Sequence, residues 1–422
     1  METILHYEWK LLYLPHLKYN SMIYTNFLQE IINQQANTIK QSGEGMIRDR
    51  ISSIHEVDNY ALIIAGVRRC GKSTLMRQLI KKTHNDTLYV NFDDPRLYEF
   101  DLSDFRKLDN IITNSSMHTL MFDEIQVVKG WERYVRQKLD EGFNVFVTGS
   151  NASLLSRELG TSLTGRHITY ELYPFSYREF CRFNSTQINA LSVKEYMRIG
   201  GFPEYVKATH EEIMANLLDD ILIRDIAVRY NIKDTRGLRR LTVYLLSNIG
   251  NLTSANKLKE PSGLNSTTTI LEYISHLESS YLISLVPIFD YSLKKQTINP
   301  KKIYAIDMGL VTANVSQLKM NEGHKLENMV YNSLQRDYKE IYYHRNKNEE
   351  CDFIVVDKGE VVKAIQVCSN LDDDNTKREF GGLIDAMKTY NLTEGYVITL
   401  NQHDDFTKDG MKIHVVPSFD FL

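Results

Sequence analysis

Residues 66–73, GVRRCGKS, have the types and spacing that hold phosphate groups: two glycines separated by four residues, then lysine and serine. Glycines let backbone amides close around phosphate oxygens, and the positive end of a following helix favours negative charge. Lys72 is expected to reach the β- and γ-phosphates, and the Ser73 hydroxyl to ligate Mg²⁺. A glycine-rich turn with a surface lysine is the structural alternative. The predicted phosphate-binding residues are Gly66, Val67, Arg68, Arg69, Cys70, Gly71, Lys72, Ser73 and Thr74.

An acidic pair, Asp123 and Glu124, follows the apolar run HTLMF at 118–122. Asp123 is expected to hold Mg²⁺ through water, and Glu124 to polarise the attacking water. Strands often end in aspartate, so the pair becomes informative mainly together with the phosphate loop. An Asp-Glu pair favours hydrolysis over transfer to a second substrate.

Two further residues are candidates for the chemistry of a triphosphate. Ser150, after the apolar run 144–148, could sense the γ-phosphate, or with Asn151 it could cap a helix over 152–158. Arg166 could neutralise transition-state charge, on its own chain or on a neighbouring subunit, or it could be a surface arginine before a strand. The two arginines inside the phosphate loop could add positive potential there.

These residues need a parallel sheet to bring them together. An apolar β-branched run precedes the phosphate loop, and residues 74–80 have apolar side chains at helical spacing. Alternation of strands and helices predicts an α/β fold with its ligand at the carboxyl edge of a parallel sheet. The predicted strands are 61–65, 87–91, 118–124, 144–148 and 167–172.

The length of 422 residues predicts about three domains, at roughly 150 residues per domain. Lys plus Arg total 50 and Asp plus Glu total 54, so no overall basicity points to nucleic acid. Cysteines at 70, 181, 351 and 368 lie too far apart in sequence to suggest a disulfide framework or a zinc site. The apolar runs are shorter than the roughly 20 residues of a membrane helix. We therefore expect a cytoplasmic protein with no membrane partner.

The first residues do not look like a secretion signal, because 1–21 lack a basic start followed by a long apolar core. Met22 could be the biological start, and whether 1–21 belong to the native protein stays open. Residues 1–40 are predicted to form a helical lead-in, with Phe27, Ile31, Ile32 and Ile39 on its apolar face.

The middle of the chain, 211–318, is predicted to be a winged-helix domain, after an ATPase domain at 41–210. Helical spacing covers 211–232, 238–249, 253–260 and 265–279, and strand-like segments cover 281–289 and 302–306. A basic hairpin with Lys294, Lys295, Lys301 and Lys302 would be the wing, and could grip DNA phosphates. A solvated hairpin or a protein contact is the alternative. Residues 224–240 form a second basic stretch, with six basic and two acidic residues.

The C-terminal part, 319–422, has the pattern of a restriction-type nuclease fold. Glu327 lies in a predicted helix, Asp352 begins the strand 351–356, and Gln366 lies on the strand 361–368. In such a fold the carboxylates hold metal and a lysine activates water. Cys368 stands where that lysine belongs, so we expect a nuclease-like domain without nuclease activity; an unrelated α/β domain is the alternative.

Several segments together resemble a known group, the bacterial and archaeal AAA-like P-loop ATPases with a C-terminal restriction-endonuclease-like domain of unknown function. The resembling segments are GVRRCGKST (66–74), LMFDEIQ (120–126), VTGSNASLLS (147–156), LTGRHITYELYPFSYREF (163–180) and GGFPEYV (200–206). The resemblance implies ATP binding and hydrolysis.

The leading hypothesis is a Mg²⁺-dependent ATPase whose hydrolysis drives or gates rearrangement of the winged-helix and nuclease-like domains. The first alternative is an ATP-switched DNA-binding regulatory or repair protein. An active ATP-dependent nuclease is a weaker one. DNA, a protein partner and a second copy of the chain all stay open as partners.

Overall fold

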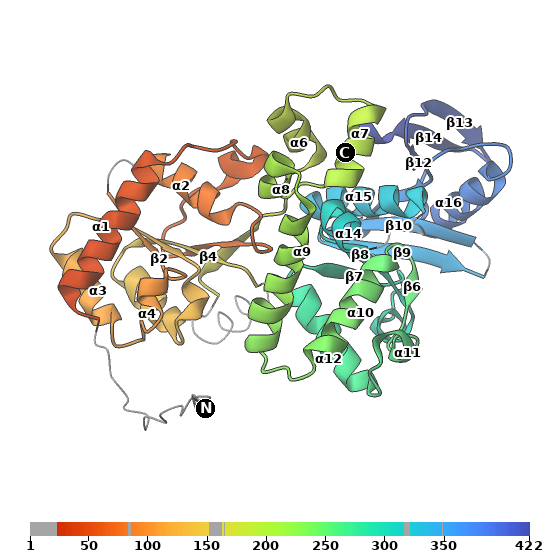
Figure 1. The fold of residues 1–422 in the computed structure, drawn as a ribbon. Coiled ribbons are helices and arrows are strands. Elements are labelled where there is room, and N and C mark those ends of the chain that lie inside the picture. The colour runs from red at the N-terminus through yellow and green to blue at the C-terminus, as the bar shows by residue number, and fades with distance from the viewer. Residues whose placement is uncertain (1–22, 83–85, 152–162, 164, 316–320, 348) are drawn as a thin grey trace, which may run out of the picture.

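The computed structural model describes residues 23–82, 86–151, 163, 165–315, 321–347 and 349–422. The predicted ATPase domain lies at one end of the molecule, and the middle and C-terminal domains pack together at the other (Figure 1). The expected helix 152–158 and the question about 1–21 lie outside the described residues.

A five-stranded parallel sheet forms the ATPase domain, in the order β2-β3-β4-β1-β5. Its strands are β1 (Ala61–Ala65), β2 (Thr87–Asn91), β3 (Thr119–Asp123), β4 (Asn144–Gly149) and β5 (His167–Glu171). This confirms the predicted α/β fold class and the five strands. Every residue of β1 is buried, because Leu62 and Ile64 face one apolar cluster while Ile63 faces the other.

Helices cover both faces of this sheet. They are α1 (Thr25–Gln41), α2 (Lys72–Lys82), α3 (Phe105–Thr113) and α4 (Trp131–Asp140), with short 3₁₀ helices η1 (Asp49–Ser53), η2 (Pro95–Leu97) and η3 (Ile125–Val127). The expected lead-in helix is α1, which lies along β2 and α3. Its buried stripe contains Leu28 in place of Phe27, a residue that is 43% exposed.

Helices also connect the ATPase domain to the rest of the chain. They are α6 (Tyr177–Asn184), α7 (Ala190–Ile199), α8 (Pro203–Ala208), α9 (Glu211–Asp220) and the π-helix η4 (Ile221–Val228). The predicted helix 211–232 is therefore α9 followed by a π-helix. Such segments occur often at functional sites.

The middle domain combines helices with a three-stranded antiparallel sheet, β6-β8-β7. Its elements are α10 (Thr235–Ser247), β6 (Leu252–Thr253), α11 (Lys259–Ser262), α12 (Thr267–Ser279), β7 (Ile283–Val286), α13 (Leu293–Ile298) and β8 (Lys301–Ala305). The expected helix 253–260 is reduced to four residues, and a helix, α13, occupies the expected hairpin tip. The identification of the middle domain as a winged helix stays a prediction.

The C-terminal domain is built on a six-stranded mixed sheet, in the order β13-β14-β12-β11-β10-β9. Helix α14 (Met308–Asn314) precedes this domain and packs on α7 and α9. The elements of the domain are α15 (Glu322–Asp337), β9 (Glu340–Asn346), β10 (Glu349–Asp357), β11 (Glu360–Val367), α16 (Thr376–Tyr390), β12 (Glu394–Thr399), β13 (Asp404–Lys408), β14 (Met411–Pro417) and α17 (Ser418–Phe421). The predicted helix around Glu327 and both predicted strands are present. The other four strands were not predicted from the sequence.

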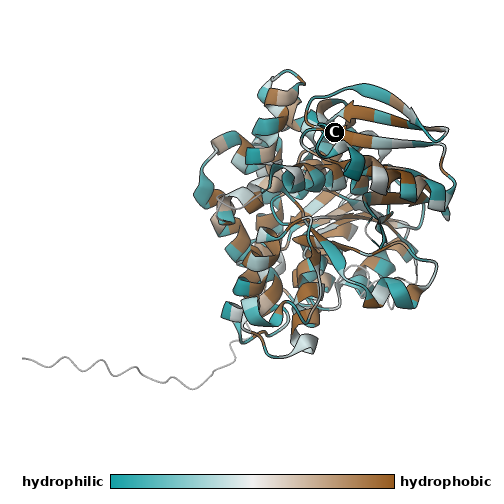
Figure 2. Cartoon of the chain, turned by 90° about the vertical axis from the view of Figure 1, so that its right-hand side faces the viewer, coloured by the Kyte–Doolittle hydropathy of each residue, from teal (hydrophilic) through white to brown (hydrophobic). Residues whose placement is uncertain are grey.

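Hydrophobic residues gather on the strands and on the inward sides of the helices (Figure 2). One continuous cluster of buried apolar residues extends from one face of the ATPase sheet through the middle domain to the C-terminal domain. Among the described helices, none has the length and apolar character needed to cross a membrane.

Candidate functional site

The phosphate loop joins the end of β1 to α2, as its chemistry requires. A Cβ atom at Gly66 would lie 2.1 Å from the carbonyl oxygen of Leu172, so only glycine fits this crossing. Gly71 has a φ of +106°, which favours glycine, and Arg69 also has a positive φ, of 62°. Two of the tight backbone positions thus coincide with the two glycines of the motif.

The loop leaves backbone donors available for an anion. The N–H groups of Val67, Arg68, Arg69 and Gly71 have no hydrogen-bond acceptor among the described residues. They precede the N-terminus of α2, where the helix dipole favours negative charge. This donor set fits the phosphate groups of a nucleotide.

Lys72 and Glu124 meet in front of the loop. The ammonium of Lys72 donates to the carbonyl oxygens of Gly66 and Val67 at 3.1 and 3.2 Å, and lies 3.5 Å from Glu124 Oε1. Burial opposes both charges, but the mutual attraction with neighbouring groups raises the pKa of Lys72 and lowers the pKa of Glu124. Glu124 therefore stays ionised near neutral pH, as a group that polarises water must.

Asp123 is fully buried and is held by side chains from two neighbouring strands. Tyr89 on β2 donates to its Oδ2 at 2.7 Å, and the Thr148 hydroxyl on β4 donates to its Oδ1. Thr148 also accepts the backbone N–H of Glu124 at 2.9 Å. Burial, with the charge of Glu124, raises the pKa of Asp123, while hydrogen bonds including one with Ser73 oppose that shift. An anionic oxygen next to the Ser73 hydroxyl is a donor set that fits Mg²⁺.

Tyr89 and Thr148 were not predicted as site residues from the sequence. Both lie on strands that were predicted, but their role depends on which strands are neighbours of β3. An alternating polar position within each apolar strand was the only sequence signal.

The end of β4 lies between the phosphate loop and the acidic pair, because β4 separates β1 from β3. Ser150 is buried here, and its hydroxyl has no hydrogen-bond partner among the described residues. Asn151, also buried, donates to the Tyr230 hydroxyl at 3.4 Å. The Tyr230 ring stacks on His276 of α12 with centroids 3.7 Å apart. These contacts lead from the phosphate-facing edge of the sheet into the middle domain.

Arg166 lies at the opposite end of the sheet. Its carbonyl oxygen accepts the N–H of Ala61, at the start of β1, and its guanidinium pairs with Asp140 at 2.7 Å. The phosphate loop begins at the other end of β1, about 16 Å away at roughly 3.3 Å per strand residue. Of the two alternatives for Arg166, action within its own chain does not fit this separation, which the parallel pairing of β1 and β5 fixes. Action on a neighbouring subunit stays a prediction.

The side chains of the two loop arginines turn towards the connecting helices. Arg68 forms a two-pronged ion pair with Asp225 on η4, at 2.9 and 2.7 Å. Arg69 lies 3.2 Å from both Glu204 and Asp220, at a more exposed position. The positive potential expected from these arginines is thus largely neutralised by acids.

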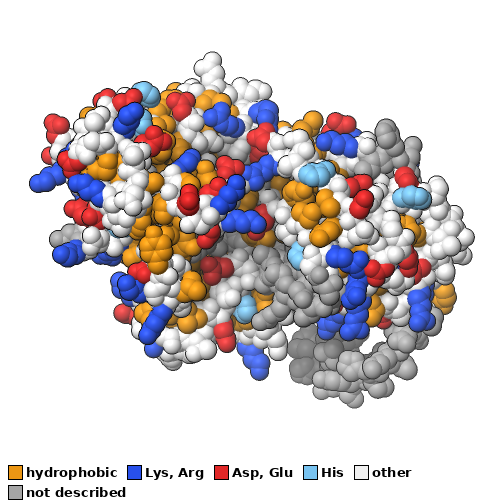
Figure 3. Space-filling model, turned by 180° about the vertical axis from the view of Figure 1, so that it is seen from behind, with side chains coloured by type: hydrophobic (Ala, Val, Ile, Leu, Met, Phe, Trp, Pro, Cys, Tyr) orange, Lys and Arg blue, Asp and Glu red, His pale blue; other side chains and the backbone are white. Residues whose placement is uncertain are grey.

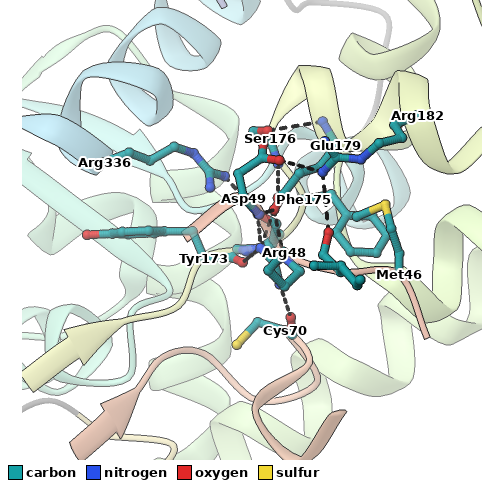
Figure 4. A network of polar contacts seen from close by, with 12 residues as sticks. Met46, Arg48, Asp49, Cys70, Tyr173, Phe175, Ser176, Glu179, Arg182 and Arg336 are labelled. Carbon is teal, nitrogen blue, oxygen red and sulfur yellow. Dashed lines mark hydrogen bonds and ion pairs between the residues drawn. The ribbon is translucent and has the colours of Figure 1, made fainter. Parts of the chain in front are cut away.

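A buried arginine, Arg48, holds the phosphate loop from behind (Figure 4). It donates twice to Glu179, at 2.9 and 3.0 Å, and to the carbonyl oxygen of Cys70 at 3.0 Å. Glu179 also completes a capping box with Ser176 at the start of α6. Arg336, from α15, donates to the Pro174 carbonyl at 2.7 Å. The segment PFSYREF (174–180) therefore links the phosphate loop to the C-terminal domain.

A second cluster lies in the C-terminal domain, where four residues compared with a nuclease site line one cavity of about 710 Å³. These residues are Glu327, Asp352, Gln366 and Cys368. Gln366 is bonded to Glu379 at 2.7 Å, and burial raises the pKa of Cys368 to about 12. A cation enters this cluster from outside the domain: Lys302, on β8, is buried against the carboxylates.

The expected basic wing therefore does not present all four of its lysines to solvent as free charges. Lys302 faces the interior, and Lys295 pairs with Asp290 at 3.1 Å. In the second basic stretch, Arg224 and Arg239 pair with aspartates. Acidic and basic side chains also alternate over the face of the molecule shown in Figure 3.

Three family models match successive parts of the chain. Family models match residues 58–181 as an AAA domain, 191–322 as a domain of unknown function (DUF8612), and 322–419 as a domain of unknown function (DUF4143). Part of the chain is similar to the Holliday junction branch migration motor RuvB of Thermotoga maritima, with 16% identity over 61% of this chain and 89% of that chain, and a TM-score of 0.29.

Two relatives match most of the chain. An uncharacterized protein of Methanocaldococcus jannaschii is 33% identical over 92% of this chain and 92% of its own length. An uncharacterized protein of Haemophilus influenzae is 30% identical over 84% of this chain and 92% of its own length. The chain therefore belongs to the family of archaeal and bacterial proteins that these relatives represent, an AAA-like P-loop ATPase domain followed by a C-terminal domain of unknown function.

Proposed function

We propose that this protein binds ATP with Mg²⁺ at the phosphate loop and hydrolyses it. The observation that carries the proposal is the meeting of Lys72 with Glu124, at 3.5 Å, beside the free backbone N–H groups of the loop. The loop amides and Lys72 bind the phosphates, and Glu124 polarises the attacking water. Mg²⁺, held by Ser73 and Asp123, neutralises charge on the phosphates when it is bound.

Tyr89 and Thr148 position this machinery. Their bonds to Asp123 fix both carboxylate oxygens, and the bond from Glu124 N–H to Thr148 fixes the backbone of the acidic pair. The Ser150 hydroxyl, buried at the end of β4 and without a hydrogen-bond partner among the described residues, is proposed as the γ-phosphate sensor. If Arg166 is catalytic, it acts at the phosphate loop of a neighbouring subunit.

Hydrolysis is proposed to alter the contacts that leave the ATPase domain. The phosphates of ATP would compete with Asp225 for Arg68, because Arg68 belongs to the phosphate loop and a guanidinium binds carboxylate and phosphate alike. Asn151 provides a second route, through Tyr230 to His276. These contacts support coupling of the ATPase domain to the middle domain, which in turn packs on the C-terminal domain.

Three variants test the proposal with two measurements, Mg²⁺-ATP binding by calorimetry and phosphate release. Glu124→Gln should bind ATP and lose turnover, by about 10²-fold or more for loss of a general base. Lys72→Ala should lose both, while Arg69→Gln should retain both because its backbone stays in the loop. Absence of ATP binding by the wild-type protein would rule the proposal out.

The charges found in the middle domain give less support to a DNA-binding switch than the sequence did. Lys294 and Lys301 are the only lysines of the expected wing that the structure leaves without a carboxylate partner among described residues. Turnover measured with and without DNA tests this alternative directly, and strong stimulation would revive it.

A further inference from the structure

Lys302 is a basic residue of the middle domain that ends inside the C-terminal domain. It lies on β8, where Lys302 and Tyr304 share one face of the strand. Its ammonium lies 2.7 Å from Asp352 Oδ1, 2.9 Å from Glu350 Oε1 and 3.0 Å from Glu327 Oε1. The lysine side chain is only 2% exposed.

The surroundings hold this lysine firmly. Tyr304 donates to the same Glu327 oxygen at 2.6 Å. Asn328 exchanges two hydrogen bonds with the backbone of Ala305, at 2.7 and 2.9 Å. These hydrogen bonds hold strand β8 against α15. The ammonium can therefore leave the carboxylates only if β8 separates from α15 or the lysine side chain changes its rotamer.

A metal ion and this ammonium would need the same place. A divalent cation takes carboxylate oxygens at about 2.0 to 2.6 Å, so it would have to sit among the oxygens that now surround the ammonium. Burial opposes the charge of Lys302, yet the three carboxylates together raise its pKa well above the ordinary value. The cluster therefore already holds a permanent positive charge.

We propose that Lys302 is the resident cation of the cluster formed by Glu327, Glu350 and Asp352: it excludes a divalent metal ion from the C-terminal domain and ties that domain to the middle domain. This gives the expected absence of nuclease activity a cause other than the cysteine at 368. A positive charge is present, but it stands in the position of the metal instead of beside it. The proposal does not depend on ATP hydrolysis.

Binding of Mn²⁺, followed by the electron paramagnetic resonance of the free ion without nucleotide, tests the proposal on the full chain. Lys302→Met removes the charge and keeps most of the side-chain length, so this variant should bind one more Mn²⁺ than the wild type. Lys302→Met/Asp352→Asn should lose that additional ion. Lys301→Met is the matched control, because this neighbouring lysine lies on the opposite face of β8, and it should behave as the wild type.

The Lys302→Met variant could fail to fold without metal, because the buried carboxylates of Glu327 and Asp352 and the partly exposed one of Glu350 would then lack their cation. In that case Mn²⁺ should restore its folding, and no rescue by Mn²⁺ would overturn the proposal. Wild-type Mn²⁺ binding that Asp352→Asn abolishes would overturn it too. The same holds for metal-dependent DNA cleavage by the wild type that Asp352→Ala abolishes.

Discussion

Both carboxylate oxygens of Asp225 accept hydrogen bonds from the guanidinium of Arg68, at 2.7 and 2.9 Å, and so join the phosphate loop to the π-helix η4. The Asp225 side chain is 5% exposed, whereas that of Arg68 is 18% exposed. A two-pronged pair in this environment is strong, because little water competes for either partner.

We expect a double-mutant cycle of Arg68→Gln and Asp225→Asn to give a coupling free energy of about 1 to 3 kcal/mol. Thermal unfolding of the four proteins measures it. Arg69→Gln, which removes a partly exposed arginine of the same loop, should cost about 1 kcal/mol or less.

The coupling free energy between Arg68 and Asp225 should decrease when Mg²⁺-ATP is present, since phosphates compete for Arg68. Additive effects of the two substitutions would contradict the assigned pair.

Tyr89→Phe should raise the Mg²⁺ concentration needed for half-maximal ATP turnover by about tenfold. The reason is that hydrogen bonds to charged groups contribute about 1.5 to 3 kcal/mol. The substitution removes only the hydroxyl that holds Asp123 Oδ2. Turnover measured over a Mg²⁺ series checks the prediction, and Tyr98→Phe is the control because that tyrosine is 90% exposed. An unchanged Mg²⁺ dependence would show that Tyr89 does not help Asp123 to bind Mg²⁺.

Arg48→Gln should lower the free energy of unfolding of the ATPase domain by about 3 to 5 kcal/mol, because it leaves the Glu179 carboxylate buried without its cation. The side chains of Arg48 and Glu179 are 7% and 4% exposed. Arg50→Gln, two residues away, breaks a pair with Asp337 whose side chains are 51% and 68% exposed, and should cost about 1 kcal/mol or less. Similar losses of melting temperature in both variants would argue against the buried network of Figure 4.

The stability of the wild type should depend on pH through Glu327. Burial, then the charge of Asp352, raises the pKa of Glu327 from 4.5 to about 7 in the folded protein. A raised folded pKa means that this group stabilises the fold most below pH about 4.5 and loses that contribution as pH rises to about 7.

The melting temperature of Glu327→Gln, measured between these two pH values, should therefore rise relative to the wild type as pH increases. Gln cannot ionise, so this variant lacks the penalty that the wild type acquires. Glu322→Gln, in the first turn of the same helix and with a side chain 50% exposed, is the control. The opposite slope would show that Lys302 governs the ionisation of Glu327 more strongly than burial does.

Features that depend on neighbours along the chain were readable from sequence. The phosphate loop needs glycine where its backbone is crowded or turned, and the adjoining strand needs apolar residues on both faces, so residues 61–73 carry their own structural requirement. The acidic pair was predictable for a similar reason, because it directly follows a buried strand.

Contacts that join distant segments were decided only by the tertiary structure. The order of the strands makes Tyr89 and Thr148 neighbours of Asp123, and the same parallel pairing moves Arg166 to the far end of the sheet. Lys302 looked like a wing lysine because its sequence neighbours are basic, yet docking of β8 on α15 buries it among carboxylates of another domain. A charge acquires its partner from the packing of domains, and no local pattern records that packing.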